Sequence, residues 1–213
     1  MAVEGNVCIR PARREDAPAM ERIFLQSFAD TVEDLLPRGA PEGVFEDIMA
    51  FLIWADDEDC LVAVLDGDVV GYCVAPANMF RIWIRAPLSR RMWRLAWLAV
   101  SGGLGMGFRG VLTLLGNKVT FFASFGVARF RGTAQILSVA VDPVARGRGV
   151  GTRLVEVALA NLRDRGTKFV KLEVRPDNTP ARKMYEKMGF VAQGSTEDSH
   201  GRWVVMLKDL GED

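Results

Sequence analysis

Histidine is almost absent from this sequence, because His200 is the only one among 213 residues. A metal site built from several histidines, or a catalytic triad that uses histidine, has little to build on, so we expect no metal. Cysteine is also scarce, since Cys8, Cys60 and Cys73 are too few for a disulfide framework. All three lie in apolar runs that indicate strands, so we expect buried thiols in a reducing cytoplasm.

A secretory leader is not expected, because residues 1–6 carry no basic region and no apolar region follows them. The composition is 49% apolar and 25% charged, which is ordinary for a soluble globular protein. At this length the chain can bury one sizeable core and is short for two. We therefore expect a single domain over residues 1–213.

The pattern of apolar residues predicts strands and helices in an α/β order. In the first half the predicted elements are a strand at 7–10, helices at 16–28 and 45–54, and a hairpin of 60–65 with 69–74 around an Asp-Gly turn. In the second half they are a strand at 134–141, a helix at 150–165, a strand at 168–174, a helix at 180–188, and a hairpin of 191–193 with 203–207. Strand, helix and strand in close succession form a βαβ unit with parallel strands. The flanking hairpins make the predicted sheet mixed.

A glycine-rich turn joins the predicted strand at 134–141 to the helix that follows. Residues 146–151 read Arg-Gly-Arg-Gly-Val-Gly. Glycine permits positive φ and a close approach of the backbone to a ligand, and the N–H groups at a helix N-terminus attract an anion. Thr152 and the two arginines of the turn add further donors. A ligand that carries phosphate is the natural occupant.

This turn has three other interpretations. A P-loop requires Lys and then Ser or Thr after its last glycine, whereas Gly151 is followed by Thr152 and Arg153. A dinucleotide-binding turn requires a different glycine spacing and further βαβ units, although Glu173 stands about where its ribose-binding acid would stand. The third interpretation is a glycine-rich connection that binds nothing. It would rarely need three glycines and two arginines.

At these residues the sequence resembles the GNAT acetyltransferases. Residues 146–151 fit that family's motif Gln/Arg-x-x-Gly-x-Gly/Ala, and residues 178–190 look like its segment Asn-x-x-Ala-x-x-x-Tyr-x-x-x-Gly-Phe. The two motifs occur in the family's order and spacing, so the resemblance is specific over about 135–207. A weaker similarity is Gly71-Tyr72 in the predicted hairpin.

The resemblance implies an α/β fold with a mixed, strongly twisted sheet of six or seven strands and helices on both faces. It also implies transfer of an acetyl or short acyl group from acetyl-CoA to an amine or hydroxyl acceptor by direct attack. Tyr185 would protonate the leaving thiolate. The residues implied to bind the cosubstrate are Val139, Ala140, Val141, Arg146, Gly147, Arg148, Gly149, Val150, Gly151, Thr152, Asn178 and Arg182.

One departure from the family concerns the general base. Relatives commonly carry a glutamate on the strand before the turn, but residues 135–139 contain no acid. Glu173 on the neighbouring strand is the best replacement, Ser138 and His200 are weaker ones, and water is another. Glu173 also fits an ordinary paired carboxylate. The alternative function is therefore an acyl-CoA-binding module without turnover, in which Phe would be tolerated at position 185.

A second departure is a basic, apolar insert at residues 78–131. It contains eight arginines, one lysine and no acid, so its charge is +9 within a chain whose formal net charge is zero. Residues 95–115 have the length of a membrane span, but five glycines favour two shorter helices folded back on each other. We therefore expect a helical insert.

Three functions compete for this insert. Its tryptophans and arginines suit a peripheral contact with the inner membrane face through residues 81–125, with a membrane-associated or lipid-linked acceptor. A lid over the acceptor cleft is the second interpretation, and a homodimer contact or added core is the third. Single-stranded nucleic acid fits less well, because the insert contains long aliphatic runs, so no nucleic acid is expected.

Overall fold

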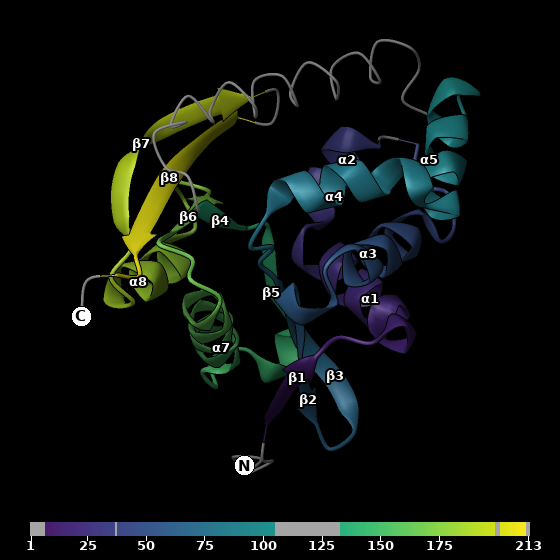
Figure 1. The fold of residues 1–213 in the computed structure, drawn as a ribbon. Helices are drawn as coiled ribbons and strands as arrows, with labels where there is room; N and C mark the ends of the chain where they lie inside the picture. Colours follow the sequence, from purple (N-terminus) through teal and green to yellow (C-terminus); the bar gives the residue numbers. More distant parts are fainter. Residues whose placement is uncertain (1–6, 37, 105–132, 199–200, 212–213) are drawn as a thin grey trace.

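A computed structural model describes residues 7–36, 38–104, 133–198 and 201–211, and Figure 1 shows its arrangement. The described residues form two four-stranded sheets with helices packed around them. One sheet has the order β1-β2-β3-β5 and the other the order β4-β6-β8-β7. The α/β fold with a mixed set of strand pairs is therefore as expected.

The first sheet is antiparallel and comes mainly from the first half of the chain. Its elements are β1 (Cys8–Pro11), β2 (Cys60–Leu65) and β3 (Asp68–Val74), with the helices η1 (Arg14–Asp16), α1 (Ala17–Ser27), α2 (Ala29–Leu35), α3 (Val44–Ala55) and η2 (Asp57–Asp59) between β1 and β2. The predicted hairpin is confirmed: Asp66 and Gly67 turn between β2 and β3 with φ of 53° and 94°.

Alternate side chains of β2 and β3 enter two different cores, because successive residues of a strand point to opposite faces. Val62 and Tyr72 pack with α1 and α3 on one face. Leu61 and Cys73 pack with α7 (Val150–Asp164) on the other. Helices therefore cover both faces of the first sheet, which Figure 1 shows with α1 and α3 on one side and α7 on the opposite side.

The predicted strand at 134–141 is divided at Leu137. Its first part is β4 (Thr133–Ile136), which pairs in parallel with β6 (Phe169–Val174). Its second part is β5 (Ser138–Val141), which pairs antiparallel with β3. The chain thus changes its pairing partner at one residue. This change makes two sheets of what the sequence predicted as one, and gives eight strands in the described residues rather than six or seven.

The remaining elements are the last two strands of the second sheet and the helices of this half of the chain. They are η4 (Pro143–Ala145), α7, α8 (Thr179–Lys187), β7 (Val191–Asp198) and β8 (Gly201–Asp209). The parallel pairing of β4 with β6 around α7 confirms the predicted βαβ unit. The closing hairpin is also confirmed, with strands longer than predicted.

The first part of the insert is helical, with α4 (Met79–Arg85), η3 (Ala86–Leu88) and α5 (Arg90–Val100). The expected second helix beyond the glycine cluster and the rest of the insert to 131 lie outside the described residues. Within the described ranges, we find no helix that is both long enough and apolar enough to cross a bilayer.

One sequence expectation about cysteine is wrong. Cys60 and Cys73 are buried free thiols as expected, but Cys8 is exposed. Cys8 opens β1, which forms an edge of the first sheet and whose two end residues are exposed. An apolar run indicated the strand correctly, but it could not show that the strand lies at an edge.

Candidate active site

The change of pairing at Leu137 opens the molecule between β5 and β6. Among the described residues β5 pairs only with β3, while β6 pairs with β4 and β8. One edge of β5 therefore keeps backbone N–H and C=O groups that no other strand uses. Cavities adjoin this opening on both sides, and they carry most of the residues that the sequence singled out.

The glycine turn has a backbone that only glycine adopts easily. Gly147 and Gly149 both have φ of +75°, and a Cβ added at either would have no atom within 4 Å. Gly149 is the N-cap residue of α7, and no side chain caps this helix end. The first N–H groups of α7 are thus left to an outside acceptor, where the helix dipole favours a negative charge.

The start of the turn is fixed by Asp142. Its carboxylate accepts the backbone N–H of Val144 at 3.1 Å and pairs with Arg22 of α1 at 2.5 Å. The guanidinium of Arg22 lowers the pKa of Asp142, with a further contribution from the backbone donor. This contact between a buried carboxylate and a half-exposed guanidinium holds η4, and the turn that follows it, against α1.

The turn forms one wall of a cavity of about 440 Å³, which we call the donor cavity. Its lining includes ten of the predicted cosubstrate-binding residues and the predicted acid: Val139, Ala140, Val141, Arg146, Gly147, Gly149, Val150, Gly151, Thr152, Asn178 and Tyr185. Residues from β5, the turn, α7 and α8 are thus brought together. The helix end among these residues can attract a negatively charged group.

Two predicted residues do not line this cavity. Arg148 is exposed within the turn, and Arg182 donates to the carbonyl of Pro176 at 3.2 Å and lies 3.7 Å from Glu186. Arg146 lines the cavity, but its guanidinium donates to the carbonyl of Val141 at 2.9 Å. The positive charges of this turn therefore stand at the rim or support the backbone, while its glycines and the start of α7 line the cavity.

A second, smaller cavity of about 270 Å³ lies on the other side of the opening, and we call it the acceptor cavity. Four residues line both cavities: Val139, Asn178, Ala181 and Tyr185. Its own lining is largely apolar, and it also includes the carboxylate of Glu173. The two predicted catalytic residues are therefore brought to one place.

Tyr185 is buried in α8, where its ring packs edge-on against Phe190 with the ring centres 5.6 Å apart. Burial raises the pKa of Tyr185, so its hydroxyl keeps its proton at neutral pH. Burial also makes this phenol a weaker acid than an exposed one, so its position beside both cavities, rather than its pKa, fits it to donate a proton. Asn178 caps the same helix by accepting the N–H of Ala181 at 3.2 Å, so capping and cavity lining are combined in one side chain.

Glu173 lies on β6 beside a buried lysine. Its Oε1 is 2.9 Å from Nζ of Lys171, whose side chain is only 7% exposed. Of the two weaker candidates for a base, Ser138 lines the same cavity and its Oγ lies 2.9 Å from the hydroxyl of Tyr72. His200 lies outside the described residues.

The sequence interpretation missed most of the acceptor cavity. Its additional lining residues are Phe24, Phe28, Thr31, Ile136, Leu137, Leu172, Val174, Arg175 and Trp203. They come from α1, α2, β4, β6, β8 and the chain segments between strands and helices. The helical spacing of Phe24 and Phe28 indicated an apolar face, but nothing in it showed that this face lines a cavity rather than the core.

Comparison with known proteins identifies the family. Residues 25–190 match the Acetyltransferase (GNAT) family. The chain belongs to the GNAT acetyltransferases. The matched range covers most of the chain and includes both motifs, the one at the turn and the one at α8.

Matches to curated proteins cover only part of the chain. A mycothiol acetyltransferase of Catenulispora acidiphila is 43% identical over 61 residues, which are 29% of this chain and 19% of that protein. An uncharacterized N-acetyltransferase of Methanocaldococcus jannaschii is 40% identical over 80 residues, which are 38% of this chain and 34% of that protein. The chain thus matches only about a fifth to a third of the length of these relatives.

Solved GNAT structures share the fold. Ard1 from Thermoplasma volcanium has a TM-score of 0.61 and 21% identity, covering 95% of this chain and 97% of that one. The yncA protein of Salmonella typhimurium, solved with its cofactor acetyl-CoA, has a TM-score of 0.60 and 17% identity, covering 97% of this chain and 95% of that one. At these identities the likeness shows the fold.

Proposed function

We propose that this protein is an acetyl-CoA-dependent N-acetyltransferase, formed by residues 1–213 as one domain with the insert at 78–131. It transfers the acetyl group, or a short acyl group, to an amine, with a hydroxyl as the second class of acceptor. The observation that carries the proposal is the meeting of the donor and acceptor cavities at Tyr185. Family membership and a relative solved with acetyl-CoA support it.

In this proposal the glycine turn and the start of α7 hold the pyrophosphate of coenzyme A through backbone N–H groups. The free edge of β5 pairs with the amides of the pantetheine arm, and Asn178 contacts the same arm. This arrangement directs the thioester toward the point where the two cavities join. Positioning two reactants at one point supplies much of the catalytic effect in such direct transfers.

The residues at the junction handle the protons. The acceptor nitrogen forms a bond to the acyl carbon while the bond from that carbon to sulfur breaks. Glu173, or a water beside it, takes the proton that the nitrogen loses, and Tyr185 gives its phenolic proton to the departing sulfur. Tyr185 suits this step by its position, because it lines both cavities where they join.

The acceptor is proposed to be membrane-associated or lipid-linked, with the protein at the inner membrane face of the cytoplasm. The buried free thiols Cys60 and Cys73 fit a reducing compartment. A coenzyme A-binding module without turnover is the second candidate, favoured by the absence of an acid from residues 135–139. The two differ in whether acetyl transfer can be measured.

The first test is calorimetric titration with acetyl-CoA of the wild type and of two matched glycine variants. Gly149→Ala and Gly166→Ala place the same methyl group at φ of +75° and +76°, in both cases without an atom within 4 Å. Both should therefore lose similar stability, of about 1 kcal/mol. Only Gly149 lines the donor cavity.

We expect the wild type and Gly166→Ala to bind acetyl-CoA equally, and Gly149→Ala to bind at least about tenfold more weakly because a Cβ enters the phosphate site. Equal binding by all three proteins would show that the turn does not hold the pyrophosphate. No binding of any acyl-CoA by the folded wild type would remove the proposal as a whole.

A further inference from the structure

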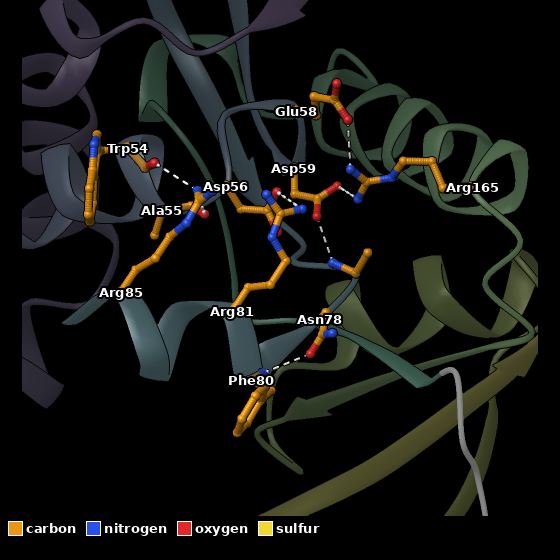
Figure 2. A network of polar contacts seen from close by, with 11 residues as sticks. Trp54, Ala55, Asp56, Glu58, Asp59, Asn78, Phe80, Arg81, Arg85 and Arg165 are labelled. Carbon is orange, nitrogen blue, oxygen red and sulfur yellow. Dashed lines mark hydrogen bonds and ion pairs between the residues drawn. The ribbon is translucent and has the colours of Figure 1, made fainter. Parts of the chain in front are cut away.

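The helices α4 and α5 turn their basic residues toward the rest of the protein. In Figure 2, Arg81 and Arg85 extend from α4 toward Asp56, Trp54 and Ala55. Arg81 lies 3.7 Å from the carboxylate of buried Asp56, and Arg85 donates to the carbonyl of Ala55 at 2.7 Å. These contacts, together with buried Ile82, attach α4 to the end of α3.

The helix α5 is attached in the same way. Arg91 and Arg94 both pair with Asp47 of α3, whose carboxylate is buried. Arg94 also donates to the carbonyl of Glu42 at 3.1 Å. A buried carboxylate shared by two guanidinium groups fixes which side of α5 faces α3, because leaving either partner unpaired is costly.

The outer sides of the two helices are therefore apolar. Nine large hydrophobic side chains are exposed in the described residues, and six of them lie in this segment: Phe80, Ile84, Leu88, Trp93, Trp97 and Val100. Phe80 and Ile84 are four residues apart, and Trp93, Trp97 and Val100 are spaced by four and three. Such spacings put side chains on one side of a helix. We call these six residues the outer apolar face.

One tryptophan of this face is fixed by a hydrogen bond. The indole N–H of Trp93 donates to the carbonyl of Pro87 at 2.8 Å, while 65% of the residue stays exposed. Trp97 is 71% exposed. Figure 2 shows the ring of Phe80 pointing away from the polar contacts that hold α4. An apolar face that is ordered and concentrated in one segment marks a site of contact.

The charges of the segment indicate which contact. Arg90 lies seven residues before Trp97, at one end of the stripe on α5, and is exposed without a carboxylate partner among the described residues. No acid occurs anywhere in residues 78–131, where the charge is +9. Exposed tryptophan, aliphatic and phenylalanine side chains flanked by Arg90 suit the headgroup layer of a bilayer, and the exposed guanidinium of Arg90 suits anionic lipid.

We propose that the outer apolar face docks this protein on an anionic membrane surface, with α4 and α5 lying in the headgroup layer. The proposal does not depend on acetyl transfer. It explains why the arginines of these helices pair inward with Asp47 and Asp56. A helix whose outer side met only water would carry its charged side chains outward and its apolar side chains inward. It also gives the proposed acceptor at the membrane a structural basis.

The test is flotation of the full chain with vesicles, using phosphatidylcholine alone and an equal mixture of phosphatidylglycerol with phosphatidylcholine. The main variant is Phe80→Ser with Trp97→Ser, because both side chains are mostly exposed and contribute little to the core. The matched control is Val144→Ser with Val191→Ser, which removes two exposed apolar side chains elsewhere. Arg90→Gln tests the charge.

We expect the wild type and the control to float with anionic vesicles and much less with phosphatidylcholine alone. The main variant should bind more than about tenfold more weakly, since it loses two large apolar side chains. Arg90→Gln should bind about fivefold more weakly, because one basic residue near such a surface is worth about 1 kcal/mol. Tryptophan fluorescence should shift to the blue in the wild type with anionic vesicles.

Two outcomes would overturn the proposal. In one, the main variant and the wild type float equally. In the other, no protein floats and analytical ultracentrifugation shows a dimer that the main variant alone loses, which would make the outer apolar face an interface between copies. Titration with acetyl-CoA on the same samples separates these outcomes from failure of the proposed enzyme, because none of the five substituted positions lines the donor cavity.

Discussion

Lys171 and Glu173 form an ion pair along β6, with Nζ of the lysine 2.9 Å from Oε1 of the glutamate. The lysine side chain is almost fully buried, and the glutamate lines the acceptor cavity. Residues two apart on a strand point to the same face, so the lysine holds the carboxylate at the cavity wall. This pair shows that Glu173 is a paired carboxylate, and its role as the general base stays a prediction.

The first prediction concerns this pair. Glu173→Gln should lower kcat/KM about 10²–10⁴-fold if the carboxylate is the general base. Lys171→Met should destabilise the fold by about 3–5 kcal/mol, because it leaves a partly buried carboxylate without its cation. The double variant should regain much of that stability and remain inactive. Denaturant unfolding and steady-state kinetics measure the two effects.

An inactive but stable Glu173→Gln protein separates catalysis from structure. Should this variant instead keep full activity, Glu173 would be a structural partner of Lys171 and water would be the base.

The second prediction compares the only two tyrosines in the chain. Tyr185→Phe keeps the ring contact with Phe190 and removes the proposed acid, so kcat should fall about 100-fold at nearly unchanged stability. Tyr72→Phe loses a hydrogen bond to Ser138, so it should cost about 1 kcal/mol of stability and change kcat much less. An active Tyr185→Phe enzyme would contradict the assigned role.

The third prediction concerns Asp142, which holds the start of the glycine turn. Asp142→Asn should cost about 1–3 kcal/mol, because it weakens the pair with Arg22. Since the guanidinium lowers the pKa of Asp142 in the folded protein, this stability is present above the unfolded pKa and disappears as the pH falls through the folded pKa.

The difference between wild type and Asp142→Asn should therefore be constant from pH 8 to about pH 5 and shrink below about pH 4. Thermal unfolding at several pH values measures it. A difference that grows on acidification would show that the contact with Arg22 is not what stabilises this carboxylate.

The fourth prediction concerns Asp56, whose pKa is raised in the folded protein, whereas that of Asp142 is lowered. Burial, with a contribution from the neighbouring carboxyl of Asp59, raises the pKa of Asp56 to about 6. A raised folded pKa means that the folded protein holds a proton that the unfolded chain has lost between about pH 4 and 6. The ionised form above pH 6 therefore costs stability.

Asp56→Asn removes this titration. Relative to the wild type, the variant should gain stability as the pH rises from 5 to 7.5, measured as the difference between the two melting temperatures. Asp59→Asn is no substitute as a control, because Asp59 also pairs with Arg165 and accepts the N–H of Ala77 at 2.6 Å. A pH-independent difference would mean that Asp56 titrates normally.

Local sequence signals predicted the elements that position the site. The Asp-Gly turn at residues 66–67 indicated the hairpin, and the glycines of 146–151 indicated a turn before a helix, because both depend on backbone conformations that few residues adopt. The division at Leu137 could not be predicted, since it depends on which strands lie beside 133–141. Nothing local to Phe24 or Trp203 indicated a shared cavity, because the two come together only through the packing of α1 against the sheets.

The unpaired edge of β5 allows the two sheets to move relative to each other along their boundary, which we call the seam. The halves are joined along this line by the chain at Leu137 and by side chains, without a ladder of backbone bonds between β5 and β6. A ligand that hydrogen-bonds to the free edge of β5 would supply pairing that β6 does not, and would make the seam more rigid. Amide protons of residues 138–141 should then exchange more slowly with solvent when acetyl-CoA is present. Hydrogen exchange along β5 would therefore report whether the donor cavity is occupied.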